Sequence, residues 1–458
     1  MRYYVVAFLM PLLIACGGKE ETISPTAILI SDVNIVNVEN GQLVEGQQVV
    51  IDSGLIKSIS SSVQHPSSYT RRIDGQGKFL IPGLAEMHAH IPTPSTSMRR
   101  VEETLFLYLS NGITTIRGML GHPAHLQLRE RANNGDLLSP RIFTSSPSLN
   151  GNTVPGPAIA DSLVRAYAHQ GYDFLKIHPG IQLAPFDTLV AAAHEVGITF
   201  SGHVPVAVGI RHALESRYAS IDHVDGFLEG LVPETARVKP EENGFFGYNF
   251  TSLADTSKIS ELVSMSKDFG VWVVPTQSLF ERWFAPIDAD TLLAQDEMKY
   301  MPASTLADWR RIKLETTGTD SGFNKESWEV FIRIRRQLIK ALQQNGHGLL
   351  LGSDAPQLFN VPGFSIQHEI AGMERAGLTP LQILQSGTIN PARFFNMEGQ
   401  FGTIATGKSA DLVLLDANPL QDVTAYSEIS GVMVRGRWLD REIIDQKLTE
   451  IARHAKSE

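Results

Sequence analysis

Two histidines separated by one residue, His88 and His90, are the first residues in this sequence that could do chemistry together. In a β-strand, residues i and i+2 face the same side, so a His-x-His pair at a strand end presents both imidazoles together. Such a pair suits a divalent metal. Most isolated pairs of this kind bind nothing, but this one follows the apolar run FLIPGLAEM, which strengthens the prediction of a metal site.

Four other polar residues stand at the ends of short apolar runs later in the chain. The runs DFLKIH, TFSGHV, SIDHV and GLLLGSD carry Lys176, His203, His223 and Asp354. A lone buried histidine is more often a satisfied core residue, and a lone aspartate after a strand is more often a helix N-cap. Six such residues, each at an expected strand end, instead indicate one shared site, because strand ends converge on one face of a barrel.

The elements that must position these residues alternate between strands and helices. Short apolar runs separated by segments of helical period, such as FDTLVAAAHEVG, predict a parallel sheet with helical crossovers. Eight units over residues 81–399 match one closed barrel, so we expect an α/β protein with a (β/α)₈ TIM barrel. The candidate strands are LAEMHAH, ITTIRGM, RIFTSS, DFLKIH, TFSGHV, SIDHV, VWVVPT and GLLLGSD.

Two regions far apart in the sequence predict one small β domain. Residues 27–80 and 400–440 contain short β-branched runs bounded by turn residues, such as AILISDVNIVNV and SADLVLL. We expect them to form a composite β-sandwich beside the barrel, followed by a C-terminal helix over residues 441–458.

Two connections are longer than a barrel needs, and they run over residues 226–257 and 277–327. Long connections in compact domains are usually functional or disordered. The aromatic content of the second argues for order, and we expect both to cover the barrel mouth. Packing on the outside of the barrel or against a partner subunit is the alternative. The aromatic residues of the second are Phe280, Trp283, Phe284, Trp309 and Phe323, of which Trp283 and Phe284 are expected to cover an apolar part of a substrate.

The N-terminus resembles a bacterial lipoprotein signal. Arg2 precedes an apolar run that is too short for a convincing membrane span, and Leu13-Ile14-Ala15-Cys16 resembles a lipobox. We expect a signal peptide over residues 1–15, lipidation at Cys16 and a tether over residues 16–26. No aspartate follows the cysteine, which favours the outer membrane and a periplasmic or cell-surface location. An ordinary signal peptide, or a first core strand with an incidental cysteine, is the alternative.

The bulk composition excludes several classes of protein. The 458 residues are 43% hydrophobic and 19% charged, which is typical of a globular protein and not of a disordered one. The net charge is −10, and no run of Lys or Arg indicates a groove for nucleic acid. Cys16 is the one cysteine, so an intramolecular disulfide cannot form.

Taken together, these motifs make the sequence resemble the amidohydrolase superfamily. Its members carry His-x-His on strand one, a lysine on strand four, histidines on strands five and six, and an aspartate on strand eight. The stretches IPGLAEMHAH, SGHVP, IDHVDG, GSDAP and GKSADLVLLDANPL are similar to the imidazolonepropionase/prolidase-like branch. The resemblance covers nearly the whole chain after its signal segment.

The resemblance implies a site with two divalent metal ions. In related binuclear enzymes the strand-four lysine, here Lys176, is carboxylated to N6-carboxylysine, and the carbamate bridges the ions. One ion would sit on His88, His90, Lys176 and Asp354, and the second on Lys176, His203 and His223. Zinc fits these ligands, although manganese, cobalt, nickel and iron remain open.

Two metals lower the pKa of a bridging water, and Asp354 can accept its proton and pass it to the leaving nitrogen. No Gly-x-Ser-x-Gly elbow is evident in the sequence. The sequence therefore predicts hydrolysis of an amide in a small molecule such as a dipeptide, an N-acyl amino acid or a cyclic amide. A lactonase, a phosphotriesterase-like enzyme, a mononuclear deaminase and an inactive binding lipoprotein are the alternatives, and a homo-oligomer is left open.

Some positions depart from the branch. In the branch, a Gly-rich stretch often follows the strand-four lysine, whereas this chain has His178 there. A tyrosine often follows the strand-five histidine, whereas this chain has Val204. An aspartate often follows the strand-two arginine, whereas Gly118 follows Arg117 here. These changes put dipeptide specificity in doubt. His178, His122 and Arg117 are the candidate substrate contacts, with His125 a weaker one, and a surface role for His178 is the alternative.

Overall fold

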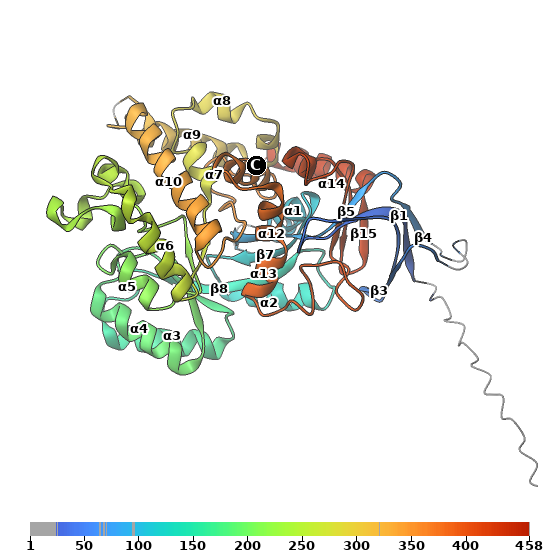
Figure 1. The fold of residues 1–458 in the computed structure, drawn as a ribbon, viewed down its shortest axis with the longest axis horizontal. Helices are drawn as coiled ribbons and strands as arrows, with labels where there is room; N and C mark the ends of the chain where they lie inside the picture. The colour runs from blue at the N-terminus through green and yellow to red at the C-terminus, as the bar shows by residue number, and fades with distance from the viewer. Residues whose placement is uncertain are drawn as a thin grey trace, which may run out of the picture.

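The computed structural model describes residues 24, 26–63, 66, 69, 71–93, 97–319 and 321–457, and it consists of a barrel and a separate sheet beside it (Figure 1). The expected signal peptide and its Cys16 lie outside the described residues. No helix within the described ranges is both long and apolar enough to cross a bilayer.

The barrel has seven regular parallel strands, in which each strand pairs with the next along the chain. Side chains at the C-terminal ends of these strands face the same end of the barrel. The strands are β6 (Leu84–Ala89), β7 (Ile113–Gly118), β8 (Arg141–Leu149), β9 (Phe174–Ile177), β10 (Thr199–Gly202), β11 (Ser220–Asp222) and β12 (Trp272–Val274).

The expected eighth strand is an extended segment over residues 348–355 that closes the barrel through isolated bridges. Leu349 pairs with Val273 of β12, and Ala355 pairs with Ala89 of β6. At Gly352 an added Cβ would lie 2.8 Å from the backbone nitrogen of His88, so only glycine allows this approach to β6. The segment turns away at Asp354, whose φ is 64°, so it forms no regular ladder.

Helices cover the outside of the barrel and follow the strands in the order expected for crossovers. In the longest, Phe331, Ile334, Leu338 and Leu342 recur at three- and four-residue spacing and are buried, which explains why it forms an amphipathic helix. The helices are α1 (Met98–Ser110), α2 (Pro123–Asn133), α3 (Pro157–Gln170), α4 (Leu183–Val196), α5 (Gly209–Glu215), α6 (Ile259–Asp268), α10 (Lys325–Asn345), α11 (Ser365–Arg375), α12 (Pro380–Gly387) and α13 (Ile389–Phe394).

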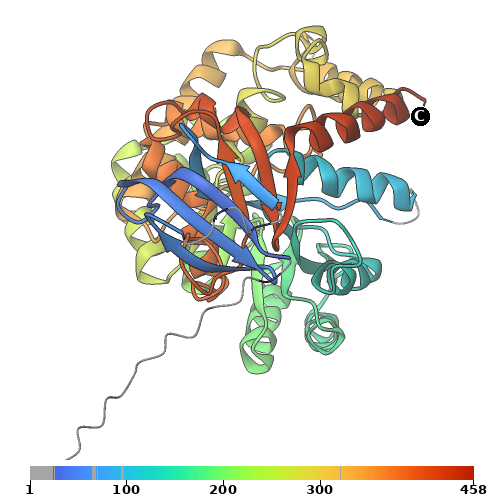
Figure 2. The same ribbon diagram turned by 90° about the vertical axis from the view of Figure 1, so that its right-hand side faces the viewer.

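Strands from both ends of the chain form one eight-stranded sheet, as Figure 2 shows face-on. N-terminal β5 lies between β1 and C-terminal β13, and a shared core that includes Val33, Leu80, Leu412 and Met433 joins the two segments. Helix α14 (Arg441–Lys456) follows the sheet. The strands are β1 (Ile28–Val36), β2 (Leu43–Asp52), β3 (Leu55–Ser60), β4 (Arg71–Asp74), β5 (Phe79–Pro82), β13 (Leu412–Leu415), β14 (Ile429–Val434) and β15 (Arg437–Asp440).

The two long connections differ in structure. The connection after β11 consists of short 3₁₀ turns, namely η2 (Glu229–Leu231), η3 (Glu234–Ala236), η4 (Pro240–Glu242), η5 (Phe245–Leu253) and η6 (Thr256–Lys258). The connection after β12 is mainly helical, with α7 (Gln277–Glu281), α8 (Ala289–Leu293), η7 (Asp296–Tyr300) and α9 (Ala303–Thr317).

Candidate metal centre

His88, His90 and Asp354 meet at the C-terminal face of the barrel, where one ligand atom from each lies within 4.8 Å of the others. His90 Nε2 lies 2.7 Å from Asp354 Oδ1, and His88 Nε2 lies 3.4 Å from the same oxygen. The backbone of Asp354 donates to the carbonyl of His88 at 3.0 Å, so the barrel closure itself brings these side chains together. Two imidazoles and a carboxylate are a donor set that fits a divalent ion such as zinc.

The histidines predicted on later strands extend this group into a continuous row of rings. The ring of His88 lies 4.7 Å from that of His223, and the ring of His223 lies 4.6 Å from that of His203. His178 stacks on His203 at 5.4 Å. Burial is the main cause that lowers the pKa of both His88 and His223. The next cause is the charge interaction with Lys176 for His88 and with His203 for His223. Metal binding requires a neutral imidazole, so this lowering of the pKa favours the form that can hold a metal.

Lys176 is completely buried near these histidines, and its amine is paired with a carboxylate. Lys176 Nζ lies 3.0 Å from Asp222 Oδ2, and Asp222 Oδ1 accepts a hydrogen bond from Arg117 at 3.1 Å. His88 Nδ1 lies 3.4 Å from Asp222 Oδ2. Asp222 thus ties strands β6, β7 and β9 together at the base of the site.

His203 and His223 each have an orienting partner. His203 Nδ1 lies 3.0 Å from Asp225 Oδ2, and His223 Nδ1 lies 2.8 Å from Thr276 Oγ1. Metal-binding histidines almost always use their second ring nitrogen in such a bond, which fixes the ring. Buried Arg335 adds a hydrogen bond of 2.8 Å to the carbonyl of His223.

Backbone strain gathers at the same place. His223, Thr276 and Asp354 have φ values of 64°, 44° and 64°, and Phe246 has 49°, although none of them is glycine. Residues other than glycine rarely adopt positive φ, and such conformations cluster at functional sites. The folded barrel thus holds these side chains in positions that the isolated chain would not favour.

Glu86 lies two residues before His88 on β6 and supports His88 and Asp354 from behind. Its carboxylate accepts hydrogen bonds from the backbone nitrogens of His88 at 3.0 Å and Ser353 at 2.8 Å. It thereby links β6 to the segment that carries Asp354. Burial raises the pKa of Glu86 to about 8. Its acidic side chain inside an apolar run, LAEMHAH, was a signal in the sequence that our reading did not use.

The candidate substrate contacts have different surroundings. Arg117 has no exposed surface, and its guanidinium bonds to Met87 O, Ser220 Oγ and Asp222. These contacts hold Asp222 in place, and a direct contact between Arg117 and a substrate stays a prediction. His122 is exposed and caps α2 by accepting from the backbone nitrogen of Ala124, while His125 is buried.

Of these candidates, His178 is the one that adjoins the row of rings. Its Nδ1 is buried and has no hydrogen-bond partner among the described residues. It can therefore still accept or donate a hydrogen bond toward another group.

The aromatic residues that we expected to cover the site lie one layer farther out. Trp283 and Phe284 contact Phe245, with ring separations of 4.8 and 4.6 Å, and Phe284 is buried in the core. The ring that contacts the histidines is Phe246, which lies 5.3 Å from His223 and 5.8 Å from His203. The sequence reading missed Phe246 because a single aromatic residue in a long loop has no periodic pattern.

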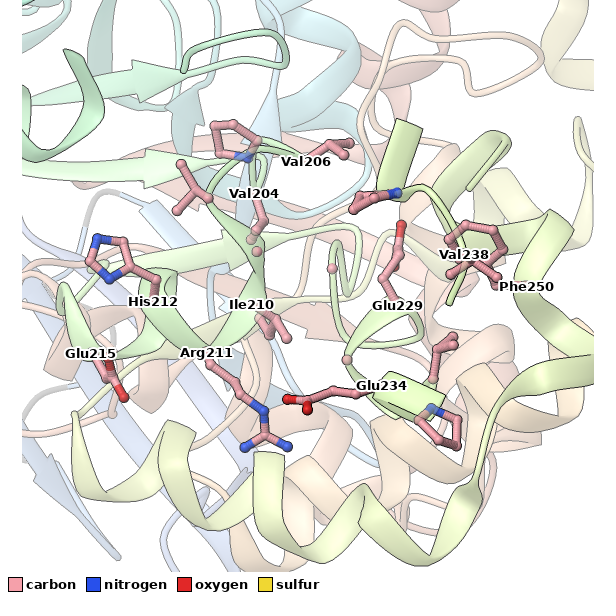
Figure 3. A pocket seen from close by; sticks show the side chains of 18 of the residues that line it. Val204, Val206, Ile210, Arg211, His212, Glu215, Glu229, Glu234, Val238 and Phe250 are labelled. Atoms are coloured by element: carbon pink, nitrogen blue, oxygen red, sulfur yellow. The ribbon is translucent and has the colours of Figure 1, made fainter. Parts of the chain in front are cut away.

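A cavity of about 510 Å³ lies beside the metal centre, between helix α5 and the turns after β11 (Figure 3). Val204 and Gly226, which line it, directly follow His203 and Asp225 in the sequence. Its walls are largely apolar, with Arg211, Glu229 and Glu234 among its polar residues, and none of the predicted metal ligands lines it. It is therefore a neighbour of the metal centre and not the centre itself.

Comparison with known proteins agrees with this geometry. The model of the amidohydrolase family matches residues 79–439, so the chain belongs to this family of hydrolases. It is 21% identical over 421 residues to ochratoxinase of Aspergillus niger, covering 86% of this chain and 82% of that protein.

Two solved structures share the fold. One is the bottromycin amidohydrolase, with a TM-score of 0.70, 23% identity and coverage of 94% of this chain and 91% of that one. The other is a Xaa-Pro dipeptidase with bound methionine, with a TM-score of 0.63, 18% identity and coverage of 90% and 100%. Both matches span at least 90% of this chain, so the likeness is one of overall fold.

Proposed function

We propose that this protein hydrolyses an amide bond in a small substrate with the help of two divalent metal ions, most simply zinc. The observation that carries the proposal is the meeting of His88, His90 and Asp354 at the end of the row of rings that continues through His223 and His203. An N-acyl amino acid, a dipeptide or a cyclic amide is the substrate class. The names of the relatives, an ochratoxinase and a Xaa-Pro dipeptidase among them, support this class.

The donor set fits two ions. His88, His90 and Asp354 would hold one, His203 and His223 the other, and Lys176, carboxylated on Nζ, would contribute to both. When bound, the ions lower the pKa of a water and polarise the scissile carbonyl. Carboxylation would remove the positive charge that now faces Asp222, but Arg117 would keep that carboxylate paired.

Asp354 is the residue that moves the proton. Its carboxylate lies within hydrogen-bond distance of His90, and its backbone nitrogen donates to the carbonyl of His88, so both neighbours fix its position. It accepts a proton from the attacking water and delivers it to the leaving nitrogen, which must be protonated to depart as an amine.

The direct test is turnover by the full chain after loading with zinc, screened against Xaa-Pro dipeptides, N-acyl amino acids, cyclic ureides and lactones. We expect hydrolysis of at least one amide class, two metal ions per chain by elemental analysis, and loss of activity on chelation with recovery on adding zinc back. Hydrolysis of lactones alone would replace the proposal with an esterase. An enzyme that turns over no substrate and binds no metal would overturn it.

We also propose that the protein is anchored by lipid at Cys16 on the periplasmic or outer face of a bacterial membrane. The lipobox-like segment before Cys16 supports this. One acyl chain on a protein gives only marginal binding to a membrane, and a second acyl chain makes the anchoring stable. Cys16→Ser should move the protein from the membrane to the soluble fraction without loss of turnover, whereas an unmodified Cys16 in the intact mass would contradict the proposal.

A further inference from the structure

The metal centre is bordered by one aromatic ring whose placement depends on an unusual backbone. Phe246 contacts the rings of both His203 and His223, at 5.8 and 5.3 Å, and is half-buried. Its φ of 49° and ψ of 46° are in the left-handed region, which a bulky residue avoids. Strain of this kind persists only where the surroundings impose it, so neighbouring residues must hold Phe246 in place.

Several hydrogen bonds close the turn that carries Phe246. Asn249 donates from its backbone to Asn243 O and from its side chain to Glu242 O, both at 3.0 Å. Asn243 in turn donates to Glu229 at 2.7 Å, and Glu229 lies on the wall of the neighbouring cavity, as Figure 3 shows. The turn is thus anchored by bonds within itself and, through Asn243, to Glu229.

The next residue, Gly247, explains why the turn can pack so closely. Its φ is 80°, and an added Cβ would lie 2.8 Å from Leu228 Cδ2 and 3.0 Å from the carboxyl carbon of Glu229. The φ of 80° alone would strain any other residue here, and the ends of these two side chains would also have to shift to accept a Cβ. A glycine is therefore required where the ring must approach the metal centre.

Behind Phe246 the surroundings are apolar. Its ring lies 4.7 Å from that of Phe245 and 5.2 Å from that of Phe280. Both pairs are edge-to-face, an arrangement that aromatic side chains prefer. Phe280 is itself covered by the guanidinium of Arg335, 3.4 Å from the ring centre. The ring of Phe246 therefore belongs to a packed group of aromatic rings that ends at His203 and His223.

We propose that Phe246 forms one wall of the substrate site and selects substrates that carry an apolar, aryl-bearing group beside the scissile amide. The inference rests on the proposed function for its reaction, but the binding preference can be measured without it. An aryl group that packs against Phe246 would replace water on both surfaces, which a methyl or hydrogen in the same place would not do.

The test uses Phe246→Asn in the full chain loaded with zinc. Asparagine tolerates the left-handed backbone better than most residues, so this variant removes the ring while favouring the same turn. Three substrates are compared: N-acetyl-L-phenylalanine, with an aryl group on the amine side; phenylacetylglycine, with one on the acyl side; and N-acetylglycine, with none. We expect kcat/KM to fall about 10-fold more for one of the aryl substrates than for N-acetylglycine.

Two controls separate the ring from general damage. Phe323→Ala removes a ring from the outer part of the same aromatic cluster, 5.3 Å from Phe284, and should leave the preference unchanged. Phe246→Leu keeps an apolar side chain, so it should retain more of the preference for aryl substrates than Phe246→Asn does. It replaces Phe246→Asn in the comparison if the asparagine variant does not fold. Metal content should equal that of the unmutated protein in each.

A binding measurement keeps the inference independent of turnover. Phenylacetate should bind the zinc-loaded protein more tightly than acetate by calorimetry, and Phe246→Asn should bring the two affinities within about 3-fold of each other. If no amide is hydrolysed but this preference depends on Phe246, the proposed function fails and the inference stands. If all substrates and both carboxylates respond equally, or not at all, while metal content is normal, Phe246 merely packs against the histidines and the inference is wrong.

Discussion

His88, His90 and Asp354, one half of the candidate metal centre, lie on two segments that are neighbours in the barrel wall. Their side chains contact one another, and a backbone hydrogen bond of 3.0 Å from Asp354 to His88 fixes the distance between the segments. The second half, Lys176, His203 and His223, comes from the ends of three consecutive strands. The hydrogen-bond partners of these side chains lie outside the ligand set and are Asp222, Asp225 and Thr276. The two halves still adjoin, because His223 Nδ1 lies 3.9 Å from Asp354 Oδ2.

This difference predicts which substitutions should weaken metal binding in each half. The first half is assembled by barrel closure, so it should persist as long as the barrel folds. Each histidine of the second half is oriented by one hydrogen bond, so single substitutions in the surroundings should weaken it selectively. Substitutions in the two halves should therefore differ in their effects on metal content and on turnover.

Lys176→Ala should abolish turnover, because it removes the only ligand that the two halves would share. We expect metal content to fall from two ions per chain to one or fewer, with the first half the more persistent, measured by elemental analysis beside steady-state kinetics. A short carboxylic acid added at high concentration should restore part of both, since an external carboxylate can take the place of the carbamate.

Lys313→Ala is the matched control for the loss of a buried lysine. Lys313 donates to backbone carbonyls in the connection after β12, at 2.6 Å to that of Trp283, and to none of the candidate ligands. Its replacement should lower stability but leave the metal content at two. Two ions per chain and near-normal turnover in Lys176→Ala would disprove the bridged arrangement.

Asp354→Asn should separate metal binding from proton transfer. Asparagine keeps the shape and one oxygen ligand but cannot accept a proton, so much of the metal should remain while kcat falls on the order of 10²–10⁴-fold. The first half should stay assembled, because its backbone bond to His88 is unaffected. Retained turnover in a variant with full metal content would move the proton-transfer role to another residue.

Much of this architecture could be predicted from the sequence, for a physical reason. Strand ends converge in a barrel, so polar residues at the ends of apolar runs identified the six candidate ligands, and the structure brings His88, His90, Asp354, His203 and His223 into one continuous group with Lys176 buried nearby.

What the sequence did not reveal are contacts between residues distant along the chain. Thr276 orients His223 only because β11 and β12 are adjacent, and Arg117 points inward to Asp222. The backbone of Phe246 depends on Gly247 and on Asn249, which no strand or helix pattern marks.

Replacing the orienting partners should weaken the second half alone. Asp225→Asn keeps the size of the side chain but removes the charge that favours the Nδ1–H tautomer of His203, and Thr276→Val removes the hydroxyl that contacts His223. We expect each to lower the affinity for one of the two ions by about 10- to 100-fold, measured by competition with a chelator. The other ion should titrate as in the unmutated protein, and equal weakening of both would show that the two halves are not separable.

The smallest expected effect concerns His178, which touches the second half without belonging to it. Its ring stacks on His203 at 5.4 Å, and its buried Nδ1 has no partner among the described residues. If it contacts the substrate, His178→Ala should raise KM about 2- to 10-fold, which is the net value of one hydrogen bond, and leave both ions in place. His169→Ala is the control, because that exposed histidine lies in the last turn of α3 and should not change KM. Loss of one ion in His178→Ala would instead make His178 a fourth ligand of the second half, and that half would then hold its metal as firmly as the first.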